Sequence, residues 1–131
     1  MIAGIDHVAL PMRDAQSMVT FYRALGFDIE ENKAIVCARL GAQMINFHRP
    51  ELWPNGRFTL RAPAAVPPCG DLCFEWRGTV DEAIAKIGEL GVPVEEGPVE
   101  RVGGRGLPAM SVYFRDPDGN LLELLAYRDP A

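Results

Sequence analysis

The sequence of 131 residues predicts an α+β fold made of two tandem βαβββ units. Short strand-like stretches flank two stretches with helical spacing of their apolar residues, and this order of elements occurs twice. The two copies also match in detail. Leu25-Gly26-Phe27 corresponds to Leu90-Gly91-Val92, and the strand that begins near His7 corresponds to the strand that begins at Asp71. A repeat of this kind predicts one architecture used twice.

The first unit is expected over residues 3–48. Its opening strand, residues 3–10, is an apolar run that ends before Pro11, a residue that strands tolerate only at their ends or edges. Asp14 is a typical helix N-cap, and apolar residues at helical spacing continue from there until Gly26, which is suited to a helix end. Three further strands are predicted at residues 27–31, 34–40 and 43–48.

A connector and a second copy complete the predicted single domain of residues 1–131. Residues 49–70 contain five prolines and little periodicity, which favours a connector. The second unit, residues 71–127, repeats the order of the first. Its strands are expected at 71–76, 94–96, 109–114 and 120–127, and its helix at 81–90.

The second copy differs by a glycine-rich segment from Gly97 to Pro108, for which the sequence predicts a long loop. One interpretation is a lid that closes over a bound molecule, with Arg101 and Arg105 as candidate anchors for an anionic group. The other is a surface hairpin without such a role, because mobile glycine-rich loops are common.

Composition narrows the classes of function. Thirteen Lys and Arg against eighteen Asp and Glu give a net charge of −5 without a basic cluster, which argues against nucleic-acid partners. No run of residues is apolar enough to span a membrane or to act as a signal peptide, so we expect a cytoplasmic protein with no membrane partner. Its three cysteines are then expected to be reduced.

Candidate metal ligands come from three strands. The sequence has two histidines, His7 and His48, and strand alternation places His48 on the same face as Asn46. Glu123 interrupts four leucines, and a buried carboxylate needs a partner, for which a metal ion is one candidate. Two imidazoles and a carboxylate suit Fe(II), Mn, Ni or Zn. The alternative is a chance trio, with His7 a surface residue beside Asp6.

Five motifs of the sequence are typical of one protein family: IDHVAL (5–10), FYRALGF (21–27), INFH (45–48), DLCFEW (71–76) and YFRDPDGNLLELLAY (113–127). With them the chain resembles the vicinal oxygen chelate superfamily of glyoxalase I, extradiol dioxygenases, methylmalonyl-CoA epimerase, and fosfomycin-resistance and bleomycin-binding proteins. Residues 92–106 are most similar to the branch named glyoxalase-domain-containing proteins. The resemblance implies that the paired units form a half-open mixed-sheet cavity.

The resemblance also implies metal ligands on the first and last strands of each unit. The first-strand positions are His7 and Asp71, and the last-strand positions are Asn46 and Glu123, with His48 two residues beyond Asn46. Many members carry a histidine where this chain has Asp71, for which three roles are open: a ligand, a general base, or a salt-bridged residue at the start of a strand. We predict that His7, His48 and Glu123 bind a divalent metal, with Glu123 and Asp71 as catalytic groups and Asn46 beside the ligands.

Two classes of function follow from the resemblance. One is a metal-dependent enzyme that chelates a small substrate through two neighbouring oxygens, either a lyase or isomerase of the glyoxalase type, with Asp71 or Glu123 as base, or an extradiol dioxygenase. The other is a metal-free protein that binds a small molecule or drug, as bleomycin-resistance proteins do, between aromatic side chains: Trp53, Phe58, Phe74, Trp76 and Tyr113. A homodimer is expected by analogy with the superfamily.

Overall fold

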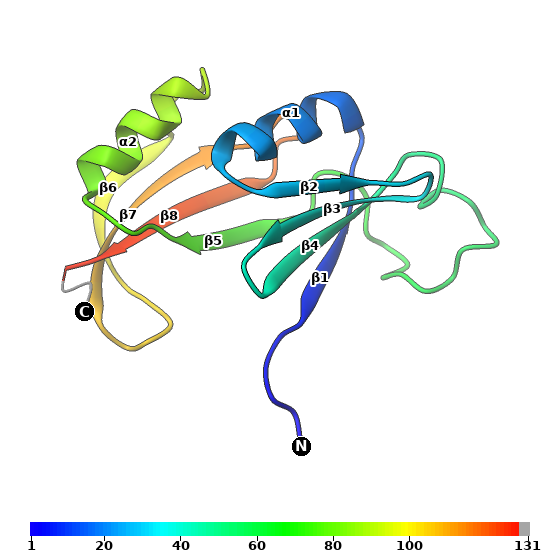
Figure 1. Cartoon of the computed structure of the whole chain (residues 1–131), viewed down its shortest axis with the longest axis horizontal. Coiled ribbons are helices and arrows are strands. Elements are labelled where there is room, and N and C mark those ends of the chain that lie inside the picture. Colours follow the sequence, from blue (N-terminus) through cyan, green and yellow to red (C-terminus); the bar gives the residue numbers. More distant parts are fainter. Residues whose placement is uncertain (129–131) are drawn as a thin grey trace. The chain divides into compact units, whose positions relative to one another are not determined.

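The computed structural model describes residues 1–128 and contains two four-stranded sheets, each with its own helix (Figure 1). The chain divides into two compact units. Unit 1 contains Met1–Gly70 together with Pro117–Gly119, and unit 2 contains Asp71–Asp116 together with the described residues from Asn120 onward. The predicted α+β fold of two tandem βαβββ units is confirmed.

Unit 1 has its elements in the order β1, α1, β2, β3 and β4. They span His7–Pro11, Ala15–Leu25, Asp28–Glu31, Ile35–Leu40 and Gln43–His48. The strand order across the sheet is β1-β4-β3-β2, with β1 parallel to β4 and the other pairs antiparallel. Strand β4 therefore lies inside the sheet, with its residues paired on both sides.

Helix α1 begins and ends where the sequence predicts. The Asp14 side chain accepts a hydrogen bond from the Ser17 amide at 3.1 Å, and Gly26 ends the helix with a φ of 122°. The buried face of the helix centres on Tyr22, which is 1 % exposed. Its ring centroid lies 5.0 Å from that of Phe47 on β4 and 5.4 Å from that of Phe27. These contacts join the helix to one face of the sheet.

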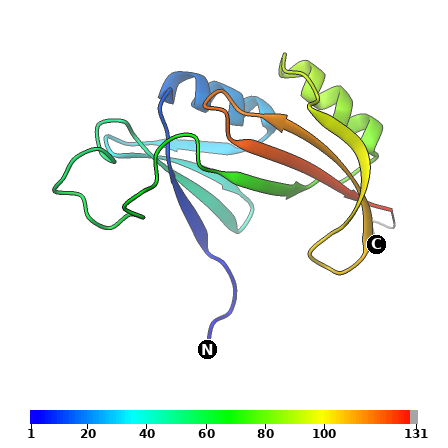
Figure 2. The ribbon, with the colours of Figure 1, turned by 180° about the vertical axis from the view of Figure 1, so that it is seen from behind.

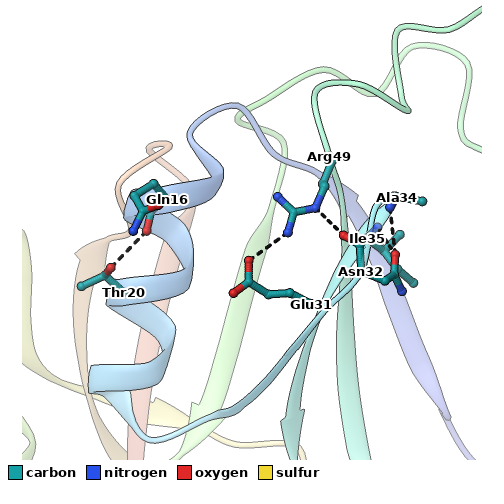
Figure 3. A network of polar contacts seen from close by, with 7 residues as sticks. All are labelled: Gln16, Thr20, Glu31, Asn32, Ala34, Ile35 and Arg49. Atoms are coloured by element: carbon teal, nitrogen blue, oxygen red, sulfur yellow. Dashed lines mark hydrogen bonds and ion pairs between the residues drawn. The ribbon is translucent and has the colours of Figure 1, made fainter.

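The end of β4 is fixed by the residue that follows it (Figure 3). Arg49 donates from Nε to the Asn32 carbonyl at 2.8 Å and from Nη2 to Glu31 at 2.9 Å. The Asn32 side chain accepts hydrogen bonds from the amides of Ala34 and Ile35, which shapes the turn between β2 and β3. The C-terminal end of β4 is thus bound to that turn.

Unit 2 has its elements in the order β5, α2, β6, β7 and β8. They span Asp71–Glu75, Val80–Glu89, Glu96–Val102, Pro108–Arg115 and Leu121–Tyr127. The strand order is β5-β8-β7-β6, the same arrangement as in unit 1, with β5 parallel to β8. Helix α2 begins after Thr79, whose hydroxyl accepts from the Glu82 amide at 3.2 Å, and its buried Ile87 lies on the side that packs on β7 and β8.

The prediction of a long loop from Gly97 to Pro108 is wrong. Strand β6 continues to Val102, so only residues 103–107 connect it to β7 (Figure 2). The register shifts between Glu96 and Val99, and this irregularity accommodates Gly97 and Pro98 within an edge strand. Glycine and proline therefore mark a bulge here rather than a loop.

No helix within residues 1–128 is long and apolar enough to cross a membrane.

Candidate functional site

Glu123 lies at the centre of one face of the unit 2 sheet. It belongs to β8, opposite Cys73 on β5 and Tyr113 on β7, and residues opposite one another share a face. The fully buried Ser111 donates its hydroxyl to Glu123 Oε2 at 2.5 Å. The carboxylate that the leucine-rich sequence left without a partner therefore has one, and this hydrogen bond fixes its orientation.

Cys73 is a second polar neighbour of this carboxylate. Desolvation, the negative charge of Glu123, a hydrogen bond with Glu123 and the charge of Asp71 together raise the pKa of the thiol to about 12. The thiol is protonated at neutral pH for this reason. A protonated thiol is a poor nucleophile and can donate a hydrogen bond to Glu123.

Both arginines predicted as anchors for an anion already have partners in unit 2. Arg105 makes two hydrogen bonds to the Glu75 carboxylate, at 2.9 and 3.0 Å, and its guanidinium lies 4.6 Å from the ring centroid of Tyr127. Arg101 donates from Nε to the Tyr113 hydroxyl at 3.0 Å. The 103–107 connection is therefore bound to β5 and β8.

His7 and Asn46 share one face of the unit 1 sheet. The Nδ1 atom of His7 lies 2.8 Å from Asp6 Oδ1, which leaves Nε2 outside this contact. Asn46 lies opposite Ala9 on β1 and Cys37 on β3. Its Oδ1 atom is buried and has no hydrogen-bond partner among the described residues.

The repeat makes these positions equivalent. His7 stands two register positions before Asn46, and Asp71 stands two before Glu123. Each unit therefore places one donor on its first strand and one oxygen donor on its last strand, diagonally across a parallel strand pair. The residue types differ between the copies: imidazole and amide in unit 1, and two carboxylates in unit 2.

The two histidines of the predicted ligand set are not brought together within unit 1. His48 lies opposite Pro11, four positions along β1 from His7, which amounts to roughly 13 Å of strand. Residues 1–128 contain no group of three or more His, Cys, Asp or Glu side chains arranged to hold a metal ion. The set of His7, His48 and Glu123 stays a prediction.

His48 instead has an aromatic and a cationic neighbour. Its ring centroid lies 5.1 Å from that of Phe58 in an edge-to-face contact. Burial, followed by the positive charge of Arg61, lowers the pKa of the imidazole below its ordinary value of 6.5. His48 is therefore neutral at neutral pH.

Sequence reasoning missed several residues that contact the predicted site residues. Alternation along 109–114 places Ser111 and Tyr113 on one face, and this pattern could have associated Ser111 with Glu123. The contacts of Phe58 and Arg61 with His48 had no such signal, because the segment 49–70 has no periodicity.

The pH dependence of stability provides a test of the environment of His48. When unfolded, His48 takes up a proton near its ordinary pKa of 6.5, whereas the folded protein resists this uptake. The contribution of His48 to stability is therefore complete above that pKa and is lost as the pH falls below it. We expect urea unfolding of His48→Gln to show a weaker decrease in stability between about pH 7 and 5 than the parent. Parallel profiles for the two proteins would contradict this.

Comparison with known proteins is consistent with the repeat and the strand motifs. Residues 4–124 match the model of the Glyoxalase/Bleomycin resistance protein/Dioxygenase superfamily. The chain is 37% identical to Virulence protein STM3117 of Salmonella typhimurium, over 97% of this chain and 86% of that protein. It is 33% identical to Glyoxalase domain-containing protein RDO1 of Mycosarcoma maydis, over 98% of this chain and 70% of that protein.

Solved structures of related proteins have the same fold. The crystal structure of Virulence protein STM3117 matches with a TM-score of 0.85 over 97% of this chain and 98% of that one. Lactoylglutathione lyase from Agrobacterium tumefaciens, 25% identical, matches with a TM-score of 0.71 over 95% and 94% of the two chains. The family match covers nearly all of the described residues. The chain therefore belongs to the glyoxalase/bleomycin resistance protein/dioxygenase superfamily.

Proposed function

We propose that the protein is a divalent-metal-dependent enzyme that acts on a small substrate chelated through two neighbouring oxygens, with lyase, isomerase or dioxygenase chemistry. Membership of the superfamily supports this class of reaction. The similarity to a lactoylglutathione lyase favours the lyase or isomerase type over ring cleavage. The metal would be Fe, Ni, Zn or Mn, which suit nitrogen and oxygen donors.

The observation that carries the proposal is the buried Oδ1 atom of Asn46. A buried acceptor without a donor costs about 1–3 kcal/mol, and a bound cation is one group that would relieve this cost. The atom belongs to the position that the repeat equates with Glu123. An unsatisfied oxygen at the same place in one copy as a carboxylate in the other supports the assignment of both to metal binding.

His7 also has the character of a metal ligand. In metal sites a ligating histidine usually donates its other ring N–H to a carboxylate or carbonyl, which fixes the tautomer. The contact between Nδ1 and Asp6 is of this kind and leaves the Nε2 lone pair available. In unit 1 the donors that we propose are therefore His7 and Asn46, and in unit 2 the donor is Glu123, with Asp71 two register positions away as a general base. His48 stays a prediction as a further ligand; it lies opposite Pro11, four positions along β1 from His7.

When bound, a divalent ion would polarise the two substrate oxygens and lower the cost of removing a proton beside them. A side chain of unit 2 would then accept that proton. Ser111 and Cys73 hold the Glu123 carboxylate in one orientation. Asp71, exposed at the start of β5 on the same face, is the carboxylate that would accept the proton.

The first test is the metal content of protein purified without chelator, measured by elemental analysis, together with the shift of the thermal midpoint when EDTA-treated protein receives Mn²⁺, Ni²⁺ or Zn²⁺. We expect bound metal and a stabilising shift, because a ligand that binds only the folded state raises the midpoint. Protein that contains no metal and shows no shift with any of the three ions would contradict the proposal and favour the metal-free binding alternative.

Asn46→Leu separates a metal role from a structural one. Leucine fills similar volume and removes the buried acceptor, so the metal-free variant is expected to be at least as stable as the parent. The stabilising shift produced by metal should fall strongly. If the variant keeps the full metal-induced shift of the thermal midpoint, Asn46 is not a ligand.

A further inference from the structure

The segment between β4 and β5 folds back against the end of the unit 1 sheet that carries His48. The indole Nε1 of Trp53 donates to the Met12 carbonyl at 2.9 Å, just beyond β1. Phe58 meets the imidazole of His48 edge to face at 5.1 Å. Two aromatic side chains of a predicted connector are therefore fixed against the sheet, although neither belongs to a strand or helix.

Arg61 places a positive charge in the same cluster. Its guanidinium lies 5.6 Å from the ring centroid of Trp53, whose indole donates to the Met12 carbonyl. The Met12 amide in turn donates to the His48 carbonyl at 2.9 Å. Its hydrogen bonds go to backbone carbonyls: Nη1 donates to Pro63 at 3.4 Å, and Nη2 donates to Ala65. No carboxylate of the described residues pairs with it.

This distinguishes Arg61 from the paired arginines of the chain. Arg49 is bound to Glu31, and Arg105 to Glu75, with charged contacts at 2.9 Å. Arg61 is half-buried, packs on an aromatic face and has no described counter-charge. A cation held in this way keeps its attraction for an anion, because carbonyl groups do not neutralise it.

We propose that Arg61, Phe58 and His48 form a binding subsite for the carboxylate of an aromatic ligand. The guanidinium would supply charge-assisted hydrogen bonds to the carboxylate, and the ring of Phe58 would contact the ring of the ligand. The imidazole of His48 can donate a further N–H hydrogen bond to the carboxylate. A carboxylate on a flat ring satisfies all three groups.

This subsite does not rest on the proposed metal function, because Arg61 and Phe58 are not among the proposed donors. It applies equally to a substrate of an enzyme and to a ligand of a metal-free binding protein. All binding measurements should therefore be made with EDTA present, so that a failure of metal binding leaves this test unaffected.

The competing explanation is that Arg61 only closes its own turn through Pro63 and Ala65. The two explanations differ for matched probes. Benzoate and benzamide have nearly the same shape, but only benzoate is charged. If Arg61 binds the carboxylate, the protein binds benzoate more tightly than benzamide. If the probes only contact the apolar surface around Phe58, the protein binds both equally well.

The experiment titrates ¹⁵N-labelled protein with each probe at constant ionic strength and follows the indole N–H signal of Trp53. We expect benzoate to bind with millimolar affinity and benzamide about tenfold more weakly, the loss typical of one charge-assisted hydrogen bond. Arg61→Met should weaken benzoate binding by a similar factor, and Arg61→Lys by less. Arg57→Met is the matched control, since Arg57 is an exposed arginine of the same segment.

The same samples also show whether the segment between β4 and β5 remains folded in the variants. Slow hydrogen exchange of the Trp53 indole N–H reports its bond to Met12, and it should persist in Arg61→Met. Equal binding of benzoate and benzamide would overturn the proposal, as would unchanged benzoate binding by Arg61→Met. Loss of binding in both Arg61 variants together with fast indole exchange would also overturn it, because Arg61 would then only hold the turn.

Discussion

Glu123→Gln is expected to lower metal affinity by about a hundredfold or more, so that the purified variant contains little metal. Glutamine matches the shape of glutamate and can still accept the hydrogen bond from Ser111, so the sheet should remain intact. What is lost is the negative charge, which is the part of the side chain that a divalent ion requires most. Elemental analysis of parent and variant, purified side by side without chelator, measures the effect.

Glu89→Gln is the control for this substitution. Glu89 is exposed at the end of α2 and pairs only weakly with Lys86, at 3.5 Å. The same chemical change there should leave metal content at the parental level. Full stoichiometric metal in Glu123→Gln, with circular dichroism spectra unchanged in both variants, would remove Glu123 from the ligand set.

Local patterns made the fold predictable. Alternation and helical spacing each indicate one element, and the Asp14 and Gly26 signals located the two ends of α1. The repeat adds a constraint on the order of the elements, which a single unit does not provide. Once Leu25-Gly26-Phe27 and Leu90-Gly91-Val92 are matched, the order of strands and helices in one copy predicts the order in the other.

The contacts of the candidate site were less predictable, because they depend on register. Strand alternation places Asn46 and His48 on one face, but only the pairing of β1 with β4 separates His48 from His7 along that face. The hydrogen bond from Ser111 to Glu123 likewise depends on how β7 lies against β8. A sequence identifies the face of a residue before it identifies its neighbours.

Glycine was the least reliable signal. The glycine-rich sequence around Gly97 predicts a loop, whereas Gly97 lies inside β6, with a φ of 113° that other residues rarely adopt. A bulge and a loop favour the same residues, and the sequence of one chain does not distinguish them. The difference has a measurable consequence for stability.

Gly97→Ala is expected to destabilise the protein by about 2–4 kcal/mol. A Cβ atom at this position would lie 2.5 Å from the Ser111 carbonyl oxygen and 3.0 Å from the Val112 Cα atom, both of which are backbone atoms of β7. The positive φ adds strain for any residue with a side chain. Because neither backbone atom can move without disturbing β7, the cost cannot be relieved by a change of rotamer.

Thermal unfolding measures this cost, and Gly104→Ala is the matched control. Gly104 lies in the 103–107 connection of the same hairpin, and a Cβ atom there would meet nothing within 4 Å. We expect the midpoint of Gly97→Ala to fall by roughly 5–15 °C and that of Gly104→Ala to change little. The clash falls on Ser111, so Gly97→Ala should also disturb the hydrogen bond to Glu123 and weaken metal binding. Equal midpoints for the two variants would mean that residues 97–102 form a pliable loop in solution rather than strand β6.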